Sequence, residues 1–426
     1  MSDSAGLPAR AAALSLLSGV LRQKRPLDAL LDTLKPLPPR DAAFARALAS
    51  SALRHFGELD AIIRKFVEKP LPPHKTGPAM EILLLGAAEL LILKNAAHAA
   101  VDGANRLAAA DKKAVHFKPL INAVLRRMTR EGEAVRETLD APRLNTPDWL
   151  WARWVAQYGE EQARAIAMAH TREAPLDINL KNSAAVAPEG RDLLPLVRRL
   201  TAEGRVEDMP GFADGGWWVQ DIAATLPVLM LGDVAGKKVI DLCAAPGGKT
   251  MQLAARGAEV TAVELDATRL ERVKENLART KLNATLVASD ARDFTERAPL
   301  VLIDAPCTAT GTIRRHPDLP WIKQGGDVTA RGSLAYEILE SARDMVEPGG
   351  LLVFAVCSLE REEGEEQIEV FLETHPEFVR APLSAEELSG HSEWISEKGD
   401  LRTLPFHLAA EGGMDGFYAA RLRRNS

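Results

Sequence analysis

The sequence predicts a doubly wound α/β domain in its second half, preceded by an all-helical region and a small α+β segment. From residue 237 onward, short and continuously apolar runs alternate with helical patterns. This alternation is typical of a parallel sheet covered by helices on both faces. Over residues 5–130, apolar side chains recur at every third and fourth position, which indicates helices. A chain of 426 residues also exceeds what a single core usually holds.

Three segments are expected from these patterns. Residues 1–135 form the all-helical domain, and residues 231–426 form the α/β domain. Between them, residues 136–230 hold linker helices and the small α+β segment. This division follows from the point at which helical periodicity gives way to charged, irregular sequence and then to short strand-like pieces.

The expected elements follow in order along the chain. The most apolar helix, and therefore the central one of its domain, is expected over 80–95. In the α+β segment, strands at 176–180 and 217–219 flank a helix near 193–200. Strands of the α/β domain are expected at 238–242, 259–264, 284–288, 300–304 and 351–356. Its helices are expected after Gly248, over 267–280, over 330–346 and, with solvated first turns, over 361–369.

Composition narrows the class of protein. Apolar residues make up 46% of the chain and charged residues 26%, as in ordinary globular proteins. The first ten residues lack the pattern of a signal peptide, and the longest apolar stretch, 82–93, is short and contains Glu89. We therefore expect a cytoplasmic protein with no membrane partner. Three scattered cysteines suit neither a disulfide framework nor a zinc site, so no metal is expected.

The distribution of charge favours a nucleic-acid partner. The net charge of -6 alone argues against one, because binders of polyanions use Lys and Arg to neutralise phosphates. However, residues 1–130 carry 20 Lys+Arg against 11 Asp+Glu, and the excess of acidic residues lies in the remainder. A basic module on an acidic body suits RNA or DNA binding. A solvated basic face without a partner explains the same charges.

Residues at the expected strand ends suggest a nucleoside cofactor. In open α/β sheets, ligands bind beyond the carboxyl ends of the strands. After the first strand, Gly247 and Gly248 allow a close backbone approach, and the next helix offers its N-terminus to an anion. Glu264 ends the second strand, where a carboxylate accepts ribose hydroxyls, and Asp290 follows the third.

The loop reads A-A-P-G-G-K, which lacks the G-x-G-x-x-G pattern of dinucleotide sites. S-adenosyl-L-methionine, which combines a ribose with a carboxylate, fits these positions. Taken alone, Pro-Gly-Gly also fits a plain turn before a helix.

Two thiols follow neighbouring strands. Cys307 comes just after the strand that ends at Asp304, and Cys357 comes directly after the next strand. A free cysteine is usually a buried, inert thiol, but two at ligand-facing strand ends favour chemistry. Carbon 5 of a pyrimidine becomes nucleophilic only after a thiolate adds to carbon 6, so methylation at carbon 5 needs such a thiol. Asp304 would stabilise the adduct, and the base must leave its stack to react.

Five sequence motifs resemble the Sun family of RNA cytosine-5 methyltransferases. They are DLCAAPGGKT at 241–250, DAPCTATG at 304–311, IRRHPDL at 313–319, VCSL at 356–359 and DGFYA at 415–419. The basic helical domain is similar to the NusB RNA-binding fold. Together they resemble the RsmB-like branch of the family, which acts on small-subunit (16S) ribosomal RNA.

The resemblance implies specific roles for residues of this chain. The cysteine that attacks carbon 6 corresponds to Cys357, and the one that assists release of the methylated RNA corresponds to Cys307. The residues implied at the S-adenosyl-L-methionine site are Cys243, Ala244, Ala245, Pro246, Gly247, Gly248, Lys249, Glu264, Asp290 and Asp304.

The sequence also departs from the family pattern at three positions: Val356 and Thr308 stand where Thr and Ser are usual, and Asp177 stands where Arg is usual. We expect a monomeric enzyme that acts on small-subunit ribosomal RNA. The same chemistry on tRNA, or a non-catalytic RNA-binding assembly factor, are the alternatives. A small-molecule methyltransferase would leave the basic helical domain unexplained.

Overall fold

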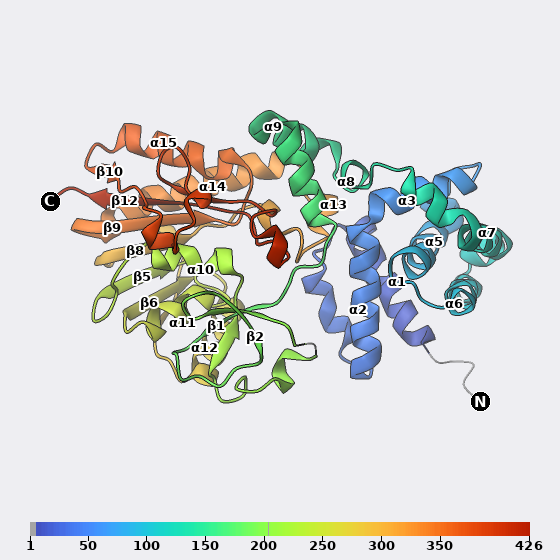
Figure 1. Cartoon of the computed structure of the whole chain (residues 1–426), viewed down its shortest axis with the longest axis horizontal. Coiled ribbons are helices and arrows are strands. Elements are labelled where there is room, and N and C mark those ends of the chain that lie inside the picture. The colour runs from blue at the N-terminus through green and yellow to red at the C-terminus, as the bar shows by residue number, and fades with distance from the viewer. Residues whose placement is uncertain (1–5, 203) are drawn as a thin grey trace. The chain divides into compact units, whose positions relative to one another are not determined.

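The structure, a computed structural model, describes residues 6–202 and 204–426 (Figure 1). Contacts group them into two compact units. The first contains the residues up to Glu173 together with Ile313–Gln324, and the second contains Ala174–Thr312 and Gly325–Ser426. The three-segment division stays a prediction. In the structure, helix α9 (Asp148–His170) groups with the helices before it.

The first unit is all-helical, as predicted. Its longer helices are α1 (Leu7–Gln23), α2 (Pro39–Arg54), α3 (Phe56–Phe66), α5 (Ala79–Ala87), α6 (Ala97–Ala110), α7 (Lys118–Glu137) and α9. The short helices α4 (Pro73–Thr76) and α8 (Ala141–Leu144) lie between them. Almost every side chain of α5 is buried, which confirms the expected central helix.

Buried acidic residues of this central region are paired. The chain continues from α5 through a π-helical turn, Ala88–Ile92. Glu81 of α5 bonds Arg22 of α1, and Glu89 of the turn accepts from Nε of Arg10 at 2.8 Å. Because an unpaired buried charge is costly, these pairs explain how an apolar helix tolerates two carboxylates.

The segment Ile313–Gln324 belongs to this helical unit, although it lies far along the chain. It contains the short helix α13 (Leu319–Ile322). The Asp318 carboxylate accepts from the backbone N–H of Leu27 at 2.9 Å. The Trp321 indole donates to the carbonyl of Leu53 at 2.9 Å, and its ring lies 4.6 Å from that of Phe56.

The second unit is built on a mixed eight-stranded sheet, which confirms the α/β fold. The order along the sheet is β10-β12-β9-β8-β5-β6-β7, with β11 paired to β12. Strands β5 (Lys238–Leu242), β6 (Glu259–Glu264), β7 (Thr285–Ala288), β8 (Ala298–Asp304) and β9 (Val346–Val356) pair in parallel. Strands β10 (Phe378–Arg380), β11 (Leu401–Thr403) and β12 (Phe417–Arg424) pair antiparallel. The sequence patterns had indicated only the parallel strands.

Helices cover both faces of this sheet (Figure 1). One core forms between the sheet and helices α14 (Gly325–Ala342) and α15 (Glu365–Thr374). The other core includes α10 (Ile222–Leu229) and α11 (Gly248–Ala255), and α12 (Ala267–Thr280) packs beside α11. The helix expected over 330–346 therefore begins and ends earlier, because β9 begins at residue 346.

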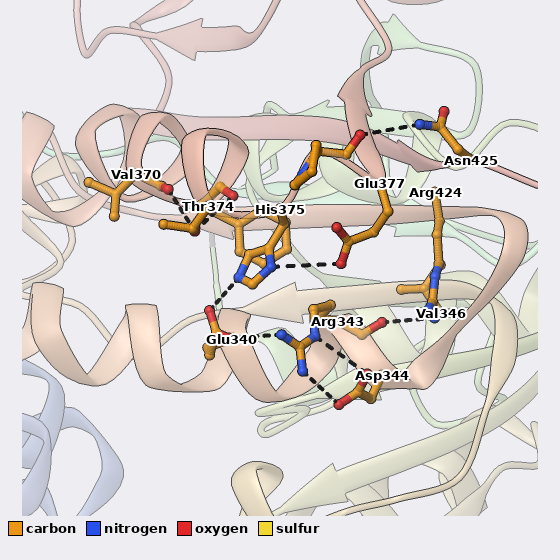
Figure 2. A network of polar contacts seen from close by, with 12 residues as sticks. Glu340, Arg343, Asp344, Val346, Val370, Thr374, His375, Glu377, Arg424 and Asn425 are labelled. Atoms are coloured by element: carbon orange, nitrogen blue, oxygen red, sulfur yellow. Dashed lines mark hydrogen bonds and ion pairs between the residues drawn. The ribbon is translucent and has the colours of Figure 1, made fainter.

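A polar network joins the ends of α14 and α15 (Figure 2). Glu340 of α14 lies 2.7 Å from Nε2 of His375, which follows α15, and 3.2 Å from Arg343. Arg424 of β12 donates to the carbonyl of Val346 at 2.6 Å. These contacts join α14 to the residue that follows α15, and β12 to the start of β9.

The predicted helix near 193–200 is wrong. The residues form a hairpin of β2 (Gly190–Leu194) and β3 (Val197–Leu200), turning at Leu196 with a φ of 64°. Pro195 within the stretch disfavours a helix. The hairpin joins the predicted strands β1 (Asp177–Leu180) and β4 (Trp217–Val219) in a sheet of order β2-β3-β1-β4.

Across the described residues, every helix is too short or too polar to cross a bilayer.

Candidate active site

The predicted site residues follow strands whose carboxyl ends meet at one edge of the sheet. Strands β5, β6, β8 and β9 run parallel, and their order changes direction between β5 and β8. Such a switch point is where ligands bind in open α/β sheets. The loop after β5, Glu264, Asp304 and Cys357 all lie at this edge.

The loop between β5 and α11 is shaped for close approach of a ligand. Gly247 is the N-cap of α11 and has a φ of 100°, where a side chain would be strained. Cys243 also has a positive φ, and burial raises the pKa of its thiol to about 12. Its thiol therefore stays protonated at neutral pH. The start of α11 presents backbone N–H groups suited to a carboxylate.

Glu264 is held at the end of β6 with its carboxylate against this loop. It accepts from the N–H of Ala245 at 3.2 Å and from that of Asp266 at 3.1 Å. Arg269 contacts the same carboxylate at 3.2 Å and donates to the carbonyl of Ala245 at 2.9 Å. The carboxylate is thus fixed where a ribose beside the loop would meet it, so these residues fit S-adenosyl-L-methionine.

Asp290 lies beyond β7 and is partly exposed, with 20% of its side chain accessible. A forked hydrogen bond from Arg292 holds the pKa of this carboxyl below its usual value. Arg292 also pairs with Glu337 of α14 at 2.6 Å. Asp290 therefore stays an anion at this edge of the sheet.

An ion pair of Lys249 and Asp304 joins the start of α11, which follows the predicted cofactor loop (residues 243–247), to the end of β8. Nζ of Lys249, on α11, lies 2.7 Å from Oδ2 of Asp304, at the end of β8. The lysine side chain is only 8% exposed and also lies over the ring of Phe417, 5.3 Å from its centroid. Asp304 is 30% exposed, so its carboxylate stays accessible to a ligand. Phe417 was part of a recognised motif, but the sequence assigned it no role.

The two sulfur atoms of Cys307 and Cys357 lie 3.5 Å apart. They meet because β8 and β9 pair in register, with Asp304 opposite Ala355, and the pairing continues as the N–H of Ala305 donates to the carbonyl of Ala355. The contact with Cys357, followed by burial, raises the pKa of the Cys307 thiol well above its usual value. Cys307 therefore stays protonated at neutral pH.

The sequence predicts that the charged run over 361–369 is solvated. The structure shows that part of it is buried. Glu363 is fully buried, and Ile368 packs into the core under α15. Alternation of charge and apolar side chains could have indicated the buried face of α15. The burial of Glu363 itself has no local signal, because it depends on loops from β8 and β9.

This fold and site define a class: an S-adenosyl-L-methionine-dependent RNA methyltransferase. The model of the 16S rRNA methyltransferase RsmB/F family matches residues 228–423, and that of the NusB family matches residues 7–130. The chain belongs to the RsmB/F family of 16S rRNA methyltransferases. The family resemblance and the helical NusB-like domain inferred from the sequence are thereby confirmed.

Similar proteins cover nearly the whole chain. Ribosomal RNA small subunit methyltransferase B of Pasteurella multocida is 34% identical, over 98% of this chain and 96% of that protein. The protein of the same name from Vibrio cholerae is 35% identical, over 97% of each. The crystal structure of PH0851 shares the fold with a TM-score of 0.76 at 22% identity, over all of both chains. NSun6 from Pyrococcus horikoshii with SFG has a TM-score of 0.56 at 19% identity, over 66% of this chain and 98% of that one.

Proposed function

We propose that this protein methylates carbon 5 of one cytosine in small-subunit (16S) ribosomal RNA, with Cys357 as covalent nucleophile. The observation that carries the proposal is the contact of the two sulfur atoms, 3.5 Å apart. Asp304, which precedes Cys307 at the end of β8, forms an ion pair with Lys249. The choice of RNA rests on the names of the similar proteins, which are ribosomal RNA small subunit methyltransferases.

The residues of the site have distinct parts in this reaction. The Cys357 thiolate adds to carbon 6 of a cytosine that has left its stack, and the electron pair of the 5,6 double bond makes carbon 5 nucleophilic. Asp304 is oriented by Lys249. In its protonated form this carboxyl group donates to ring N3 and accepts from the exocyclic amine, so it stabilises the negative charge that thiolate addition places on the ring. S-adenosyl-L-methionine, when bound, supplies an electrophilic methyl group.

Release reverses the addition. A base removes the proton from carbon 5, the double bond re-forms, and the sulfur of Cys357 leaves carbon 6 as a thiolate. By the family resemblance, Cys307 assists this release. In the resting protein its protonated thiol lies 3.5 Å from the sulfur of Cys357.

The test uses the protein and its Cys357→Ala and Cys307→Ala variants. Each is incubated with labelled S-adenosyl-L-methionine and unmodified 16S ribosomal RNA, 5-methylcytosine is mapped, and products are run on denaturing gels. We expect the unaltered protein to label one cytosine, Cys357→Ala to be inactive, and Cys307→Ala to accumulate a covalent protein–RNA band.

Methylation by Cys357→Ala would refute the assignment of the nucleophile. Labelling of tRNA with no labelling of ribosomal RNA would keep the chemistry and replace the substrate. Absence of transfer to either RNA, with binding retained, would favour the non-catalytic assembly factor.

A further inference from the structure

Glu363 contacts the residues that directly follow both cysteines. It ends the 3-10 turn Arg361–Glu363 between β9 and α15, and its side chain is fully buried. Its carboxylate accepts from the N–H of Thr308 at 2.8 Å and from the Thr308 hydroxyl at 2.6 Å. It also accepts from the hydroxyl of Ser358. One carboxylate therefore binds the loop of Cys307 and the loop of Cys357.

We propose that Glu363 is a positioning residue that holds these two loops so that the thiols of Cys307 and Cys357 stay in contact. The inference rests on the proposed function, because it matters for catalysis only if both thiols act on the same base. Burying a carboxylate is costly unless donors surround it, and the donors here come from both loops. Removing the carboxylate would take away the acceptor of the Thr308 N–H and hydroxyl, together with the bonds that Glu363 makes to both loops.

Further hydrogen bonds also join the two loops, including one between the hydroxyls of Thr310 and Ser358 at 3.2 Å. The N–H of Gly311 donates to the carbonyl of Cys357 at 3.0 Å, and the N–H of Leu359 donates to the hydroxyl of Thr310 at 2.9 Å. Of these last two contacts, the first uses the carbonyl of Cys357 itself, and the second lies beyond both cysteines along the chain. Glu363 adds the bonds that reach the residues next to the sulfur atoms.

Glu363 itself is held rigidly. A side chain at Gly364 would collide with the ring of Tyr418, at 2.7 Å, and one at Gly332 of α14 would lie 2.6 Å from the carbonyl of Glu362. The turn is thus packed between α14 and β12. Arg402 of β11 donates to the carbonyl of Ser358 at 2.7 Å and fixes the second loop from another side. A rigid anchor can set a distance between loops, which a mobile one cannot.

The negative charge of Glu363 also favours contact between the two thiols. After the contact with Cys357 and burial, it is a further cause that raises the pKa of the Cys307 thiol. A protonated Cys307 can donate to Cys357 and keeps the pair in contact.

The experiment measures thiol geometry without RNA. Phenylarsine oxide bridges two thiols that lie close together and then resists displacement by a monothiol. It is titrated against the whole protein, Glu363→Gln, Cys307→Ser and the control Glu366→Gln, whose exposed side chain lies on α15, with binding followed by intact mass. Glu363→Gln keeps the shape of the side chain but loses its charge.

We expect the protein and Glu366→Gln to bind the arsenical equally, and Cys307→Ser to lose bridged binding. Because Glu363→Gln loses charge-assisted hydrogen bonds, we expect this variant to bind the arsenical about tenfold more weakly than the unaltered protein does. In methyl transfer, its kcat should fall by a similar factor while its KM for S-adenosyl-L-methionine is unchanged, because the cofactor loop follows a different strand. A merely structural role would lower stability without changing the arsenical affinity of the folded protein.

Unchanged arsenical binding and unchanged kcat in Glu363→Gln would overturn the proposal. If that variant fails to fold, Thr308→Val and Ser358→Ala each remove one hydroxyl from the carboxylate, and each should weaken bridged binding. Unchanged binding in both would overturn the proposal equally. If ribosomal RNA is not methylated by the unaltered protein but arsenical binding depends on Glu363, the proposed function fails and the positioning role stands.

Discussion

At the scale of single residues, Asp241 shows how burial changes a carboxyl group. It lies at the end of β5 with no exposed surface, and Oδ2 accepts from the Thr250 hydroxyl at 2.6 Å. Burial raises its pKa to about 7, against the partial effect of Thr250. The residue ties the cofactor loop to the sheet by joining β5 to the first turn of α11.

This pKa predicts a dependence of stability on pH. The folded state holds the proton of Asp241 more tightly than the unfolded state, so the free energy of unfolding falls as pH rises from about 4 to about 7. Each pKa unit corresponds to about 1.4 kcal/mol. In Asp241→Asn, the fall in the free energy of unfolding over this pH range should therefore be smaller by a few kcal/mol. Urea unfolding of both proteins across this pH range measures the difference. Parallel curves would show that Asp241 does not titrate in this way.

Glu363 and Cys243 show that residue type alone does not assign a role. Both lie in segments picked out by the sequence. However, Glu363 was assigned to a solvated turn and is buried, whereas Cys243 shares its residue type with the thiol pair but lies in the cofactor loop. Their surroundings, supplied by other segments, decide their chemistry.

At the scale of elements, the hairpin of β2 and β3 depends on a buried ion pair. Arg199 of β3 lies opposite Asp177 of β1 and binds its two oxygens at 2.7 and 2.8 Å. The N–H of Ile222 donates to the same carboxylate at 3.2 Å, and Arg199 donates to the carbonyl of Glu411 at 2.7 Å. Asp177, which departs from the family pattern, thus has a partner of its own within the small sheet.

Removing this partner should destabilise the protein. Arg199→Met leaves the buried Asp177 unpaired, which typically costs about 3–5 kcal/mol. Arg198→Met is the matched control on the same strand, because Arg198 pairs with the exposed Asp192 and such pairs contribute about 1 kcal/mol or less. Chemical denaturation measures both variants. The double variant Asp177→Asn with Arg199→Met should recover part of the loss, and equal effects of the two single arginine variants would contradict the argument.

The parallel strands of the large sheet were predictable because each leaves its own pattern in the sequence. Parallel strands buried on both faces leave continuous apolar runs, and β5, β6, β8 and β9 all show them. Strands β10 and β11 are three residues each and leave too short a pattern to detect. The hairpin at 190–200 was missed because its apolar residues also fit a helix when Pro195 is given too little weight.

At the scale of the whole molecule, the chain leaves the second unit shortly after Cys307, contributes Ile313–Gln324 to the helical unit, and returns at Gly325. The helical unit is therefore completed by a segment from the catalytic half of the sequence. Lys24 and Arg54 also bond this segment, through the carbonyls of Trp321 and Arg314.

This organisation predicts that Trp321 stabilises the helices before it. Trp321→Ala loses the hydrogen bond to Leu53 and the ring contact with Phe56, at a cost of about 2–3 kcal/mol for a partly buried aromatic side chain. Hydrogen exchange should become faster in α2 and α3, while the central sheet keeps its protection. Lys323→Ala, in the same segment, serves as the control. Unchanged exchange in α2 and α3 would show that the helical unit does not need this contact.

The α/β fold, the helical domain before it and the residues that follow the strands were predictable from the sequence alone, because periodicity and strand length are local properties. The sequence also predicted that Lys249, Glu264, Asp304, Cys307 and Cys357 lie at the ligand-binding edge of the sheet. Four features came from the folded structure and not from the sequence pattern: the contact of the two sulfur atoms, the burial of Glu363 between their loops, the pairing of Asp177 with Arg199, and the return of Ile313–Gln324 to the helical unit. These features join segments far apart in the chain, and which segments meet depends on how the whole core packs.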